Sequence, residues 1–491
     1  MLLRNCFIRS WGAFKDICKP SVAHTQHNLF RFYVNDVPND SPKVCVVGSG
    51  PSGFSITQTL LKNHPSLLVD MYEKLPVPFG LVRYGVAPDH QDVKNCINGY
   101  NKTAESHRFS FYGNIEVGKD VSLDMLWLQY HAVILCTGAQ KERNLNIPGQ
   151  KSKNIFTSKQ FVGWYNGLPE YQKLDIDLSG GNAVIVGVGN VALDVARMLL
   201  KPQGLLKETD IATEAHEKLL QSNIKNVFLI GRRGPLQMAC TRKELSEITD
   251  LPHISTSIDE EHFGKAVQDA LKKKDLKRRK QQRLVSYLLK MAKMSKSNVS
   301  ADSNLSVLFL RAPLEIITNN KLVKSIKFLK YRMKDDNPYE AKPISTEEVE
   351  EISCDLLVSC IGYDNEPIDS AKIPFKNGKI VQANGRILDD EGLYACGWCN
   401  HGAKGVLADS SNDSMLTGST VLSDLQFLFA KKGNLSGSRQ IITHFKNSGK
   451  SIVKWNDWKK IDHFEVTSGK KMNKIREKVL SYDEMISFVR S

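Results

Sequence analysis

Two glycine-rich turns limit the possible folds of this 491-residue chain more than any other feature. The first is the segment 48–53 (GSGPSG), which directly follows the β-branched run 43–47 (KVCVV) and precedes a periodic apolar pattern typical of a helix. In such a strand–G-x-G-x-x-G–helix unit, Gly48 makes the tight turn, Gly50 lets a pyrophosphate approach the backbone, and Gly53 lets helix and strand pack closely. Because a helix N-terminus also attracts phosphate, we expect a dinucleotide site here.

An acidic residue at the end of the next apolar run indicates which nucleotide binds. The run 67–72 ends in Glu73, about 20 residues after the last glycine, which is the usual spacing for a ribose contact. A carboxylate in this place accepts hydrogen bonds from a ribose diol and repels a 2′-phosphate. The first site therefore suits FAD or NAD, whereas the alternative interpretation makes Glu73 a solvated strand end.

The second glycine-rich turn indicates a different nucleotide. The apolar run 183–186 leads into 187–192 (GVGNVA), in which alanine replaces the third glycine, a permitted variant. The next apolar run, 227–230, is followed by Gly231, Arg232 and Arg233 instead of an acid. A guanidinium group binds the 2′-phosphate of NADP through two hydrogen bonds, although a basic surface turn is the alternative. FAD with NADPH is the most economical combination, because it brings a hydride donor to an electron acceptor.

The composition of the chain excludes several classes of protein. Hydrophobic residues make up 41% and charged residues 24%, which excludes global disorder. No apolar run reaches the ~20 residues that a membrane-spanning helix needs, so a multispan membrane protein is excluded as well. The net charge of +14 is compatible with nucleic acid, anionic lipid or an acidic protein as partner. The ten cysteines, several of them inside apolar runs, favour a reducing compartment.

The N-terminal segment has the composition of a targeting sequence. Up to Tyr33 it carries five basic residues and only one acid, Asp16, and its apolar residues would line one face of a helix. This pattern is typical of a mitochondrial transit peptide, and the continuous apolar core of a secretory signal is missing. We therefore expect residues 1–35 to be a transit peptide, with a disordered basic N-terminus as the alternative.

Five longer segments carry a resemblance to a known family. They are 46–54 (VVGSGPSGF), 78–90 (PFGLVRYGVAPDH), 161–170 (FVGWYNGLPE), 189–197 (GNVALDVAR) and 231–237 (GRRGPLQ). Together they resemble the adrenodoxin reductases, the mitochondrial NADPH:ferredoxin oxidoreductases, from about Pro42 to the C-terminus. The resemblance implies an α/β chain with two nucleotide-binding Rossmann-like domains, in the glutathione-reductase-type flavoprotein fold. It places the first part of the FAD-binding domain at 41–145, the NADP-binding domain at 146–362 and the second part of the FAD-binding domain at 363–491.

The resemblance also implies which residues bind the cofactors. The FAD contacts carried over, beside the turn glycines Gly48, Gly50 and Gly53, are Ser52, Glu73, Leu81, Val117, Trp398, Gly405, Val406 and Leu407. The NADP contacts carried over are Val188, Gly189, Asn190, Val191, Arg232, Arg233 and Glu244, and Gly405 is expected to meet the nicotinamide as well. His90 and Asp194 match family positions near the flavin that influence proton or electron transfer. The alternative is that His90 is a hydrogen-bonded loop residue and Asp194 orients the helix start. No metal is expected.

The segment 271–283 (LKKKDLKRRKQQR) accounts for part of the charge excess. It has almost no aromatic residues, whereas nucleic-acid readers usually add stacking side chains to such a patch. The resemblance implies an acidic [2Fe-2S] ferredoxin as the partner, with Arg279 and Arg283 on the docking positions, where charges speed and orient the encounter. The alternative is that the segment is a solvated lysine-rich helix. It further implies a monomer in the mitochondrial matrix, in peripheral contact with the inner membrane. The electrons would serve iron–sulfur assembly, haem synthesis or haem monooxygenases.

Two other functions compete with this interpretation. Cys396 and Cys399 form a C-x-x-C pair, which marks dithiol centres in NADPH-dependent disulfide reductases of the thioredoxin type. The pair lies in the wrong part of the chain for that family, and Trp398 stands between the two cysteines. The second alternative is a basic nucleic-acid-binding protein that uses nucleotides only as regulatory ligands. The C-x-x-C pair and Lys404 are departures from the family pattern.

Overall fold

The computed structural model describes most of the chain from residue 40 onward, which forms one unit. The described residues are 40–272, 278–294, 301–333, 339, 342–366, 368, 373–376, 378–387, 391–403, 405 and 407–490. The predicted transit peptide (1–35), the family departure Lys404 and the predicted FAD contact Val406 lie outside the described residues. The same holds for 273–277 in the basic segment.

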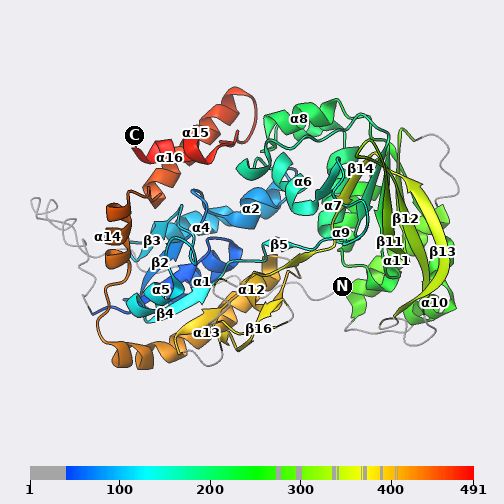
Figure 1. The fold of residues 1–491 in the computed structure, drawn as a ribbon. Coiled ribbons are helices and arrows are strands. Elements are labelled where there is room, and N and C mark those ends of the chain that lie inside the picture. Colours follow the sequence, from blue (N-terminus) through cyan, green and yellow to red (C-terminus); the bar gives the residue numbers. More distant parts are fainter. Residues whose placement is uncertain are drawn as a thin grey trace, which may run out of the picture. The chain divides into compact units, whose positions relative to one another are not determined.

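The first sheet contains seven strands in the order β18-β19-β20-β4-β1-β2-β3. Figure 1 labels β2, β3 and β4 of this sheet. They are β1 (Lys43–Val47), β2 (Leu68–Tyr72), β3 (Phe109–Tyr112), β4 (Ala132–Leu135), β18 (Gln382–Ala383), β19 (Arg386–Ile387) and β20 (Leu393–Ala395). The strands from β20 to β3 are parallel, and the β18–β19 hairpin extends the sheet in antiparallel fashion. Strand β1 is central, and its residues Val44, Cys45 and Val46 are fully buried. This is why β1 is a continuous apolar run and does not alternate with polar residues.

Helices cover both faces of the first sheet. They are α1 (Pro51–Asn63), α2 (Gly80–Tyr84), α3 (Gln91–Lys94), α4 (Cys96–Ala104), α5 (Leu123–Gln129), α12 (Trp398–His401), α13 (Leu407–Lys432), α14 (Ser438–Ser448), α15 (Trp455–Lys471) and α16 (Tyr482–Arg490). Val44 and Val46 share a core with α1 and α13, whereas Cys45 shares the opposite core with α5 and α14. Helices α1 and α13 pack closely at Gly418, where a Cβ atom would stand 2.8 Å from Thr59 Cγ2.

The second sheet has six parallel strands in the order β6-β14-β7-β8-β10-β9. They are β6 (Ile155–Thr157), β7 (Asn182–Val186), β8 (Asn226–Ile230), β9 (Ile254–Ile258), β10 (Ser303–Leu308) and β14 (Leu356–Ser359). The α-helices of this part are α6 (Ser158–Tyr165), α7 (Asn190–Leu200), α8 (Thr213–Leu220), α9 (Arg242–Thr249), α10 (Lys265–Lys272) and α11 (Arg279–Met294). Short 3-10 turns lie at Pro169–Tyr171, Gln203–Leu206, Pro235–Gln237 and Glu260–Phe263.

A three-stranded antiparallel sheet packs on one face of the second sheet. Its strands are β11 (Arg311–Asn319), β12 (Leu322–Met333) and β13 (Pro343–Ser353). Ile326 and Phe328 of β12 share a buried cluster with Val184 and Val186 of β7. Two short antiparallel pairs join β5 (Lys141–Glu142) to β15 (Tyr363–Asp364) and β16 (Phe375–Lys376) to β17 (Lys379–Ile380). The β5–β15 pair brings together the two segments in which the chain crosses between the large sheets.

The last part of the chain connects the first sheet and its helices to the second sheet and its helices. After α15, Lys474 donates a hydrogen bond to the carbonyl oxygen of Ile211 (2.6 Å), and Lys478 donates to that of Asp210 (2.9 Å). The Asp210 carboxylate also lies 2.7 Å from the Lys94 ammonium group. Residues from three distant stretches of the sequence therefore meet in one buried polar cluster.

The two parallel sheets confirm the predicted α/β class with two Rossmann-like domains. The first sheet takes its strands from 43–135 and 382–395, and the second sheet takes its strands from 155–359, between them. The domain boundaries after residues 145 and 362 stay a prediction. None of the helices in the described part of the chain is long and apolar enough to cross a membrane.

Candidate functional site

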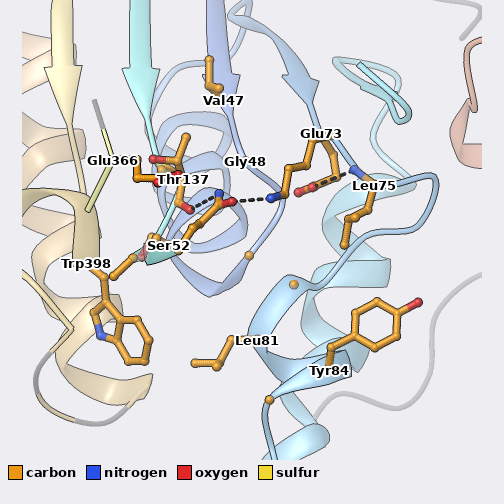
Figure 2. A pocket seen from close by; sticks show the side chains of 18 of the residues that line it. Val47, Gly48, Ser52, Glu73, Leu75, Leu81, Tyr84, Thr137, Glu366 and Trp398 are labelled. Carbon is orange, nitrogen blue, oxygen red and sulfur yellow. Dashed lines mark hydrogen bonds between the residues drawn. The ribbon is translucent and has the colours of Figure 1, made fainter. Parts of the chain in front are cut away.

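A cavity of about 460 Å³ opens at the carboxyl ends of β1, β2 and β4 (Figure 2). The predicted cofactor contacts that line it are Gly48, Gly50, Ser52, Glu73, Leu81, Val117, Val191, Trp398 and Leu407. Except for Val191, they come from both separated parts of the first sheet with its helices, here called the first sheet region. Val191 comes from the helix after the second glycine turn. The carboxyl edge of a parallel sheet is where such folds bind ligands. The cavity therefore unites residues that the sequence spreads over 360 positions.

The first glycine turn has the geometry that the motif requires. Gly48 has a φ of +105°, and a Cβ atom on it would stand 2.5 Å from the carbonyl oxygen of Cys136. A Cβ atom on Gly53 would stand 2.0 Å from the carbonyl oxygen of Gly48, so helix α1 can approach its strand only with glycine here. A Cβ atom on Gly50, in contrast, would meet nothing within 4 Å. Gly50 therefore faces open space that a phosphate group can occupy.

Glu73 is a buried residue that faces this turn, and it is not a solvated strand end. Only 8% of Glu73 is exposed. Its carboxylate accepts hydrogen bonds from the backbone N–H (2.9 Å) and the hydroxyl (2.7 Å) of Ser49 and from the backbone N–H of Leu75 (3.1 Å; Figure 2). The carboxylate is thus fixed at the end of β2, inside the cavity lining, where the sequence pattern predicts a ribose contact.

Trp398 closes the other end of the cavity (Figure 2). It starts α12 directly after Gly397, and a Cβ atom on Gly397 would stand 1.9 Å from the Ser52 hydroxyl oxygen. The indole N–H of Trp398 is buried and has no hydrogen-bond partner within the described residues. A buried donor without a partner inside a cavity suits a ligand with acceptor atoms, such as a flavin dinucleotide. Of the other predicted contacts, Gly405 is exposed and does not line the cavity.

The second glycine turn lies at the carboxyl end of β7. Gly187 has a φ of +140°, and a Cβ atom on it would stand 2.3 Å from the carbonyl oxygen of Cys360. Gly189, like Gly50, would place a Cβ atom in open space. Asn190 accepts a hydrogen bond from the backbone N–H of Thr241 (3.0 Å) and donates one to Glu244 (3.4 Å). The predicted contacts Asn190 and Glu244 are therefore neighbours, although 54 residues separate them.

Arg232 and Arg233, the predicted contacts of the NADP 2′-phosphate, follow a glycine that packs against this turn. Strands β7 and β8 are paired in register from Ala183 to Val186, so the chain leaves both strands at the same edge. A Cβ atom on Gly231 would stand 3.3 Å from Val188 Cγ1, which places the start of the arginine pair against the turn. Arg232 and Arg233 are both exposed. The pair is thus accessible to a 2′-phosphate on a nucleotide held by the turn.

His90 and Asp194 belong to a polar cluster between the first sheet region and the second sheet with its helices, here called the second sheet region. His90 Nε2 lies 2.8 Å from Glu247 Oε2, and His90 Nδ1 lies 3.9 Å from Asp194 Oδ1. Burial raises the pKa of Asp194, because it disfavours the charged form more than the nearby cations favour it. Glu247 is a residue that the sequence reasoning missed. It lies on α9, one turn after the predicted contact Glu244, and this spacing is the signal that could have found it.

Comparisons with known proteins assign the family. Residues 42–287 match the family model "Pyridine nucleotide-disulphide oxidoreductase". The mitochondrial NADPH:adrenodoxin oxidoreductase of Salvelinus fontinalis is 42% identical over 94% of this chain and 95% of its own length. The human protein of the same name is 41% identical, over 97% of both chains, and the Arabidopsis thaliana protein is 35% identical, over 90% of this chain and 94% of its own. The chain belongs to the NADPH:adrenodoxin oxidoreductase family.

The solved structures agree with this assignment. FprA from Mycobacterium tuberculosis, solved in complex with NADPH, is 33% identical to this chain. It superposes with a TM-score of 0.84 over 92% of this chain and 100% of its own. The glutathione-reductase-type flavoprotein fold that the sequence resemblance implied is therefore confirmed, as is the recognition of the adrenodoxin reductase family.

The geometry of the C-x-x-C pair does not favour dithiol chemistry in this member of the adrenodoxin oxidoreductase family. Cys396 and Cys399 are at most 1% exposed and belong to core clusters on opposite faces of the first sheet. Cys399 donates to the carbonyl oxygen of Leu135 (2.9 Å), whereas Cys396 donates to the Ser414 hydroxyl (3.2 Å). Burial raises the pKa of Cys399 to about 12, so its thiolate form is scarce at neutral pH. Both thiols therefore resemble small core residues.

The predicted docking residues lie at the start of α11. Arg279 and Arg283 are both exposed and stand four residues apart, on one face of the helix. Neither residue lines the cavity. They are thus available to a partner, and their role in docking stays a prediction.

Proposed function

We propose that the protein passes electrons from NADPH through FAD to a ferredoxin of the adrenodoxin type. The observation that carries this function is the cavity in which Gly50, Glu73 and Trp398 meet Val191. The helix after the second glycine turn thus reaches the space that the first turn lines, as hydride exchange between two bound rings requires. The relatives, which are named NADPH:adrenodoxin oxidoreductase, support the donor and the electron acceptor.

The residues of the first sheet region hold and orient FAD. The N-terminus of α1 and the open backbone at Gly50 accept the pyrophosphate, and Glu73 accepts hydrogen bonds from the ribose. The unpaired indole N–H of Trp398 is the donor for an acceptor atom of the dinucleotide. When bound, FAD supplies the conversion of a two-electron donor into single electrons. The apolar cavity wall, which includes Leu81 and Leu407, keeps water from the reacting rings.

The residues of the second sheet region select and place NADPH. Arg232 and Arg233 bind its 2′-phosphate, which distinguishes NADPH from NADH. Asn190 and Glu244, which contact each other, position the rest of the nucleotide at the N-terminus of α7. His90 Nε2 lies 2.8 Å from the Glu247 carboxylate, at the junction of the two sheet regions, and donates to it in the tautomer that carries a proton at Nε2. We infer that His90, together with Asp194, influences proton or electron transfer near the flavin.

The partner and the location follow from the same proposal. An acidic [2Fe-2S] ferredoxin docks on Arg279 and Arg283, where opposite charge speeds and orients the encounter. The mature protein works as a monomer in the mitochondrial matrix, in peripheral contact with the inner membrane. It supplies electrons to iron–sulfur assembly, haem synthesis or haem monooxygenases. The mitochondrial names of its relatives support this location.

An anaerobic absorbance titration of the purified protein with NADPH tests the proposed function. We expect a yellow protein whose flavin band bleaches stoichiometrically with NADPH and far more slowly with NADH. Long-wavelength absorbance should appear when the nicotinamide stacks on the flavin. A colourless protein that takes up no FAD on reconstitution would contradict the proposal.

Reversing the charge of the docking residues is expected to weaken ferredoxin binding. In an Arg279→Glu, Arg283→Glu variant, the KM for ferredoxin should rise about 100-fold, because two attractive contacts become repulsive. NADPH-dependent ferricyanide reduction, which needs no docking, should change by less than about twofold. The matched control is Lys290→Glu with Lys293→Glu, two exposed charges further along α11. Equal losses in both variants, or equal losses with both acceptors, would rule out the docking role.

A further inference from the structure

Arg197 is a buried cation that contacts carboxylates from both sheet regions. It lies on α7, and its side chain is 2% exposed. Its guanidinium group binds Asp89 through two hydrogen bonds, Nε to Oδ2 (2.9 Å) and Nη2 to Oδ1 (3.0 Å). Nη2 also donates to Asp194 Oδ1 (2.7 Å). Asp89 directly precedes His90, so the guanidinium group joins α7 to the segment that carries the histidine.

The third planar nitrogen of Arg197 points toward the remaining carboxylate of the cluster. Arg197 Nη1 is buried, has no hydrogen-bond partner within the described residues, and lies 3.8 Å from Glu247 Oε2. The same carboxylate oxygen contacts His90 Nε2. A buried guanidinium nitrogen that makes no hydrogen bond lowers the stability of the fold by the free energy of its desolvation. Arg197 is therefore placed to contact three carboxylates near His90, those of Asp89, Asp194 and Glu247.

The charges around Arg197 depend on it. Burial alone would raise the pKa of Asp89, but hydrogen bonds and charge from Arg197 and Lys201 outweigh burial and hold that pKa well below its usual range. Burial raises the pKa of Asp194 even though Arg197 and His90 oppose the shift. The other ionisable groups that face this cluster come from several elements: Tyr165 of α6, Asp92 of α3, Lys201 directly after α7, Lys243 of α9 and Cys360 directly after β14. Without Arg197, Asp194 would lose its main counter-charge.

We propose that Arg197 is a positioning residue for the reduction of FAD by NADPH, an inference that rests on the function proposed above. Its guanidinium group fixes Asp89 and Asp194 in one arrangement, and so makes His90 from the first sheet region meet Glu247 from the second. Asp194 lies one turn along α7 from Val191, which lines the cavity. We call the contacts of Arg197 with Asp89 and Asp194 the clamp. The clamp therefore sets the position of the second glycine turn, at the start of α7, relative to the flavin cavity. A displacement of about 1 Å at such a junction can cost a factor of about 100 in rate.

The test compares Arg197→Met and Arg197→Lys with the control Arg311→Met. Arg311 is also a buried arginine, 5% exposed and bonded to Glu350 (2.8 Å), but it lies on β11, outside the cluster. Stopped-flow absorbance gives the saturating rate of flavin reduction and its pH profile. Calorimetry gives the NADP⁺ dissociation constant, and hydrogen exchange of residues 86–94 reports directly on the clamp. Flavin content and the unfolding temperature check that each variant folds.

For Arg197→Met we expect a saturating rate about 100-fold lower, with an NADP⁺ dissociation constant changed by less than about threefold. The acid limb of the rate profile should move to higher pH, because the pKa of Asp194 rises further without its counter-charge. Exchange in 86–94 should become faster. Arg197→Lys, which keeps the charge but cannot bridge two carboxylates, should lose roughly tenfold and keep the profile. If Arg197→Met does not fold, the lysine variant decides.

Three results would overturn the inference. The first is a wild-type rate and pH profile in Arg197→Met or, if that variant does not fold, a wild-type rate in Arg197→Lys. The second is a loss of reduction rate that is matched by an equal loss of NADP⁺ affinity. The third is an equal loss of reduction rate in the control Arg311→Met. A wild-type protein that binds FAD but is not reduced by NADPH would instead refute the proposed function. The ratio of the variant's flavin-reduction rate to that of the wild type therefore tests the role of Arg197, whereas flavin reduction in the wild type alone tests the proposed function.

Discussion

The Gly53→Ala variant is expected to lose FAD and to be less stable by about 3 kcal/mol or more. The added Cβ atom would stand 2.0 Å from the carbonyl oxygen of Gly48 and 3.1 Å from its carbonyl carbon. Both are backbone atoms of the turn that ends β1, so no flexible side chain can move aside. Either α1 must shift away from the sheet, or the turn must open. The measurement is the ratio of flavin to protein absorbance after purification, together with the urea midpoint of unfolding.

Two other glycines serve as controls for this prediction. Gly50→Ala should weaken FAD binding with little effect on the stability of the apoprotein, because a Cβ atom there meets no protein atom within 4 Å. Gly204→Ala should change neither property, since Gly204 is exposed and equally uncrowded. A Gly53→Ala protein that is yellow and as stable as wild type would show that the turn is less rigid than its contacts indicate.

Removing the Glu465 side chain is expected to destabilise the fold by about 3–5 kcal/mol, the cost of leaving buried charges unpaired. Glu465 is fully buried on α15. It accepts two hydrogen bonds from Arg83 (2.9 and 2.5 Å), one from Arg476 (2.7 Å) and one from the backbone N–H of Val479 (2.9 Å). In Glu465→Ala, the 4% exposed Arg83 would keep its charge without a counter-ion. Urea unfolding of the wild type and the variant measures the difference.

The same carboxylate makes a prediction about pH. Burial alone would raise the pKa of Glu465, but the charges of Arg83 and Arg476 outweigh it and hold the pKa below its usual range. Its stabilising contribution is therefore complete above the unfolded-state pKa and is lost as the pH falls through the folded-state pKa. Glu465→Ala should accordingly flatten the acid side of the stability profile. As a control, Glu391→Ala removes a half-exposed partner of Lys431 and should cost only about 0–1 kcal/mol. A cost that small for Glu465→Ala would contradict the prediction.

The two glycine turns could be predicted from sequence because their determinants are local. The turn 48–53 is contiguous with its strand and helix, and Glu73 follows at a spacing that the β–α–β unit imposes. Gly48 is needed for its close contact with the adjacent strand end at Cys136, and Gly53 for its contact with the Gly48 carbonyl oxygen only a few residues away. The turn 187–192 is predictable for the same reason, even though its arginines follow only after an additional helix.

The contacts between distant segments could not be predicted in this way. Glu247 meets His90 across 157 residues, and Glu465 meets Arg83 across 382 residues. No spacing rule connects such pairs, because their distance depends on how the sheets and the last helices pack. In the C-x-x-C pattern, in contrast, a short spacing suggested a dithiol pair as an alternative, but its two cysteines pack into different core clusters, on opposite faces of the first sheet. Local patterns thus predicted the turns but not the clusters that join the sheet regions.

The order of strands in the first sheet has a consequence for biosynthesis. Strand β4 pairs with β20, whose residues Leu393–Ala395 emerge from the ribosome long after β1 to β4. The second sheet is complete as soon as β14 (Leu356–Ser359) has been made. We therefore expect the middle of the chain to fold first, while the N-terminal strands wait with one sheet edge unpaired. A chaperone that shields β4 during this interval would protect the nascent protein from aggregation.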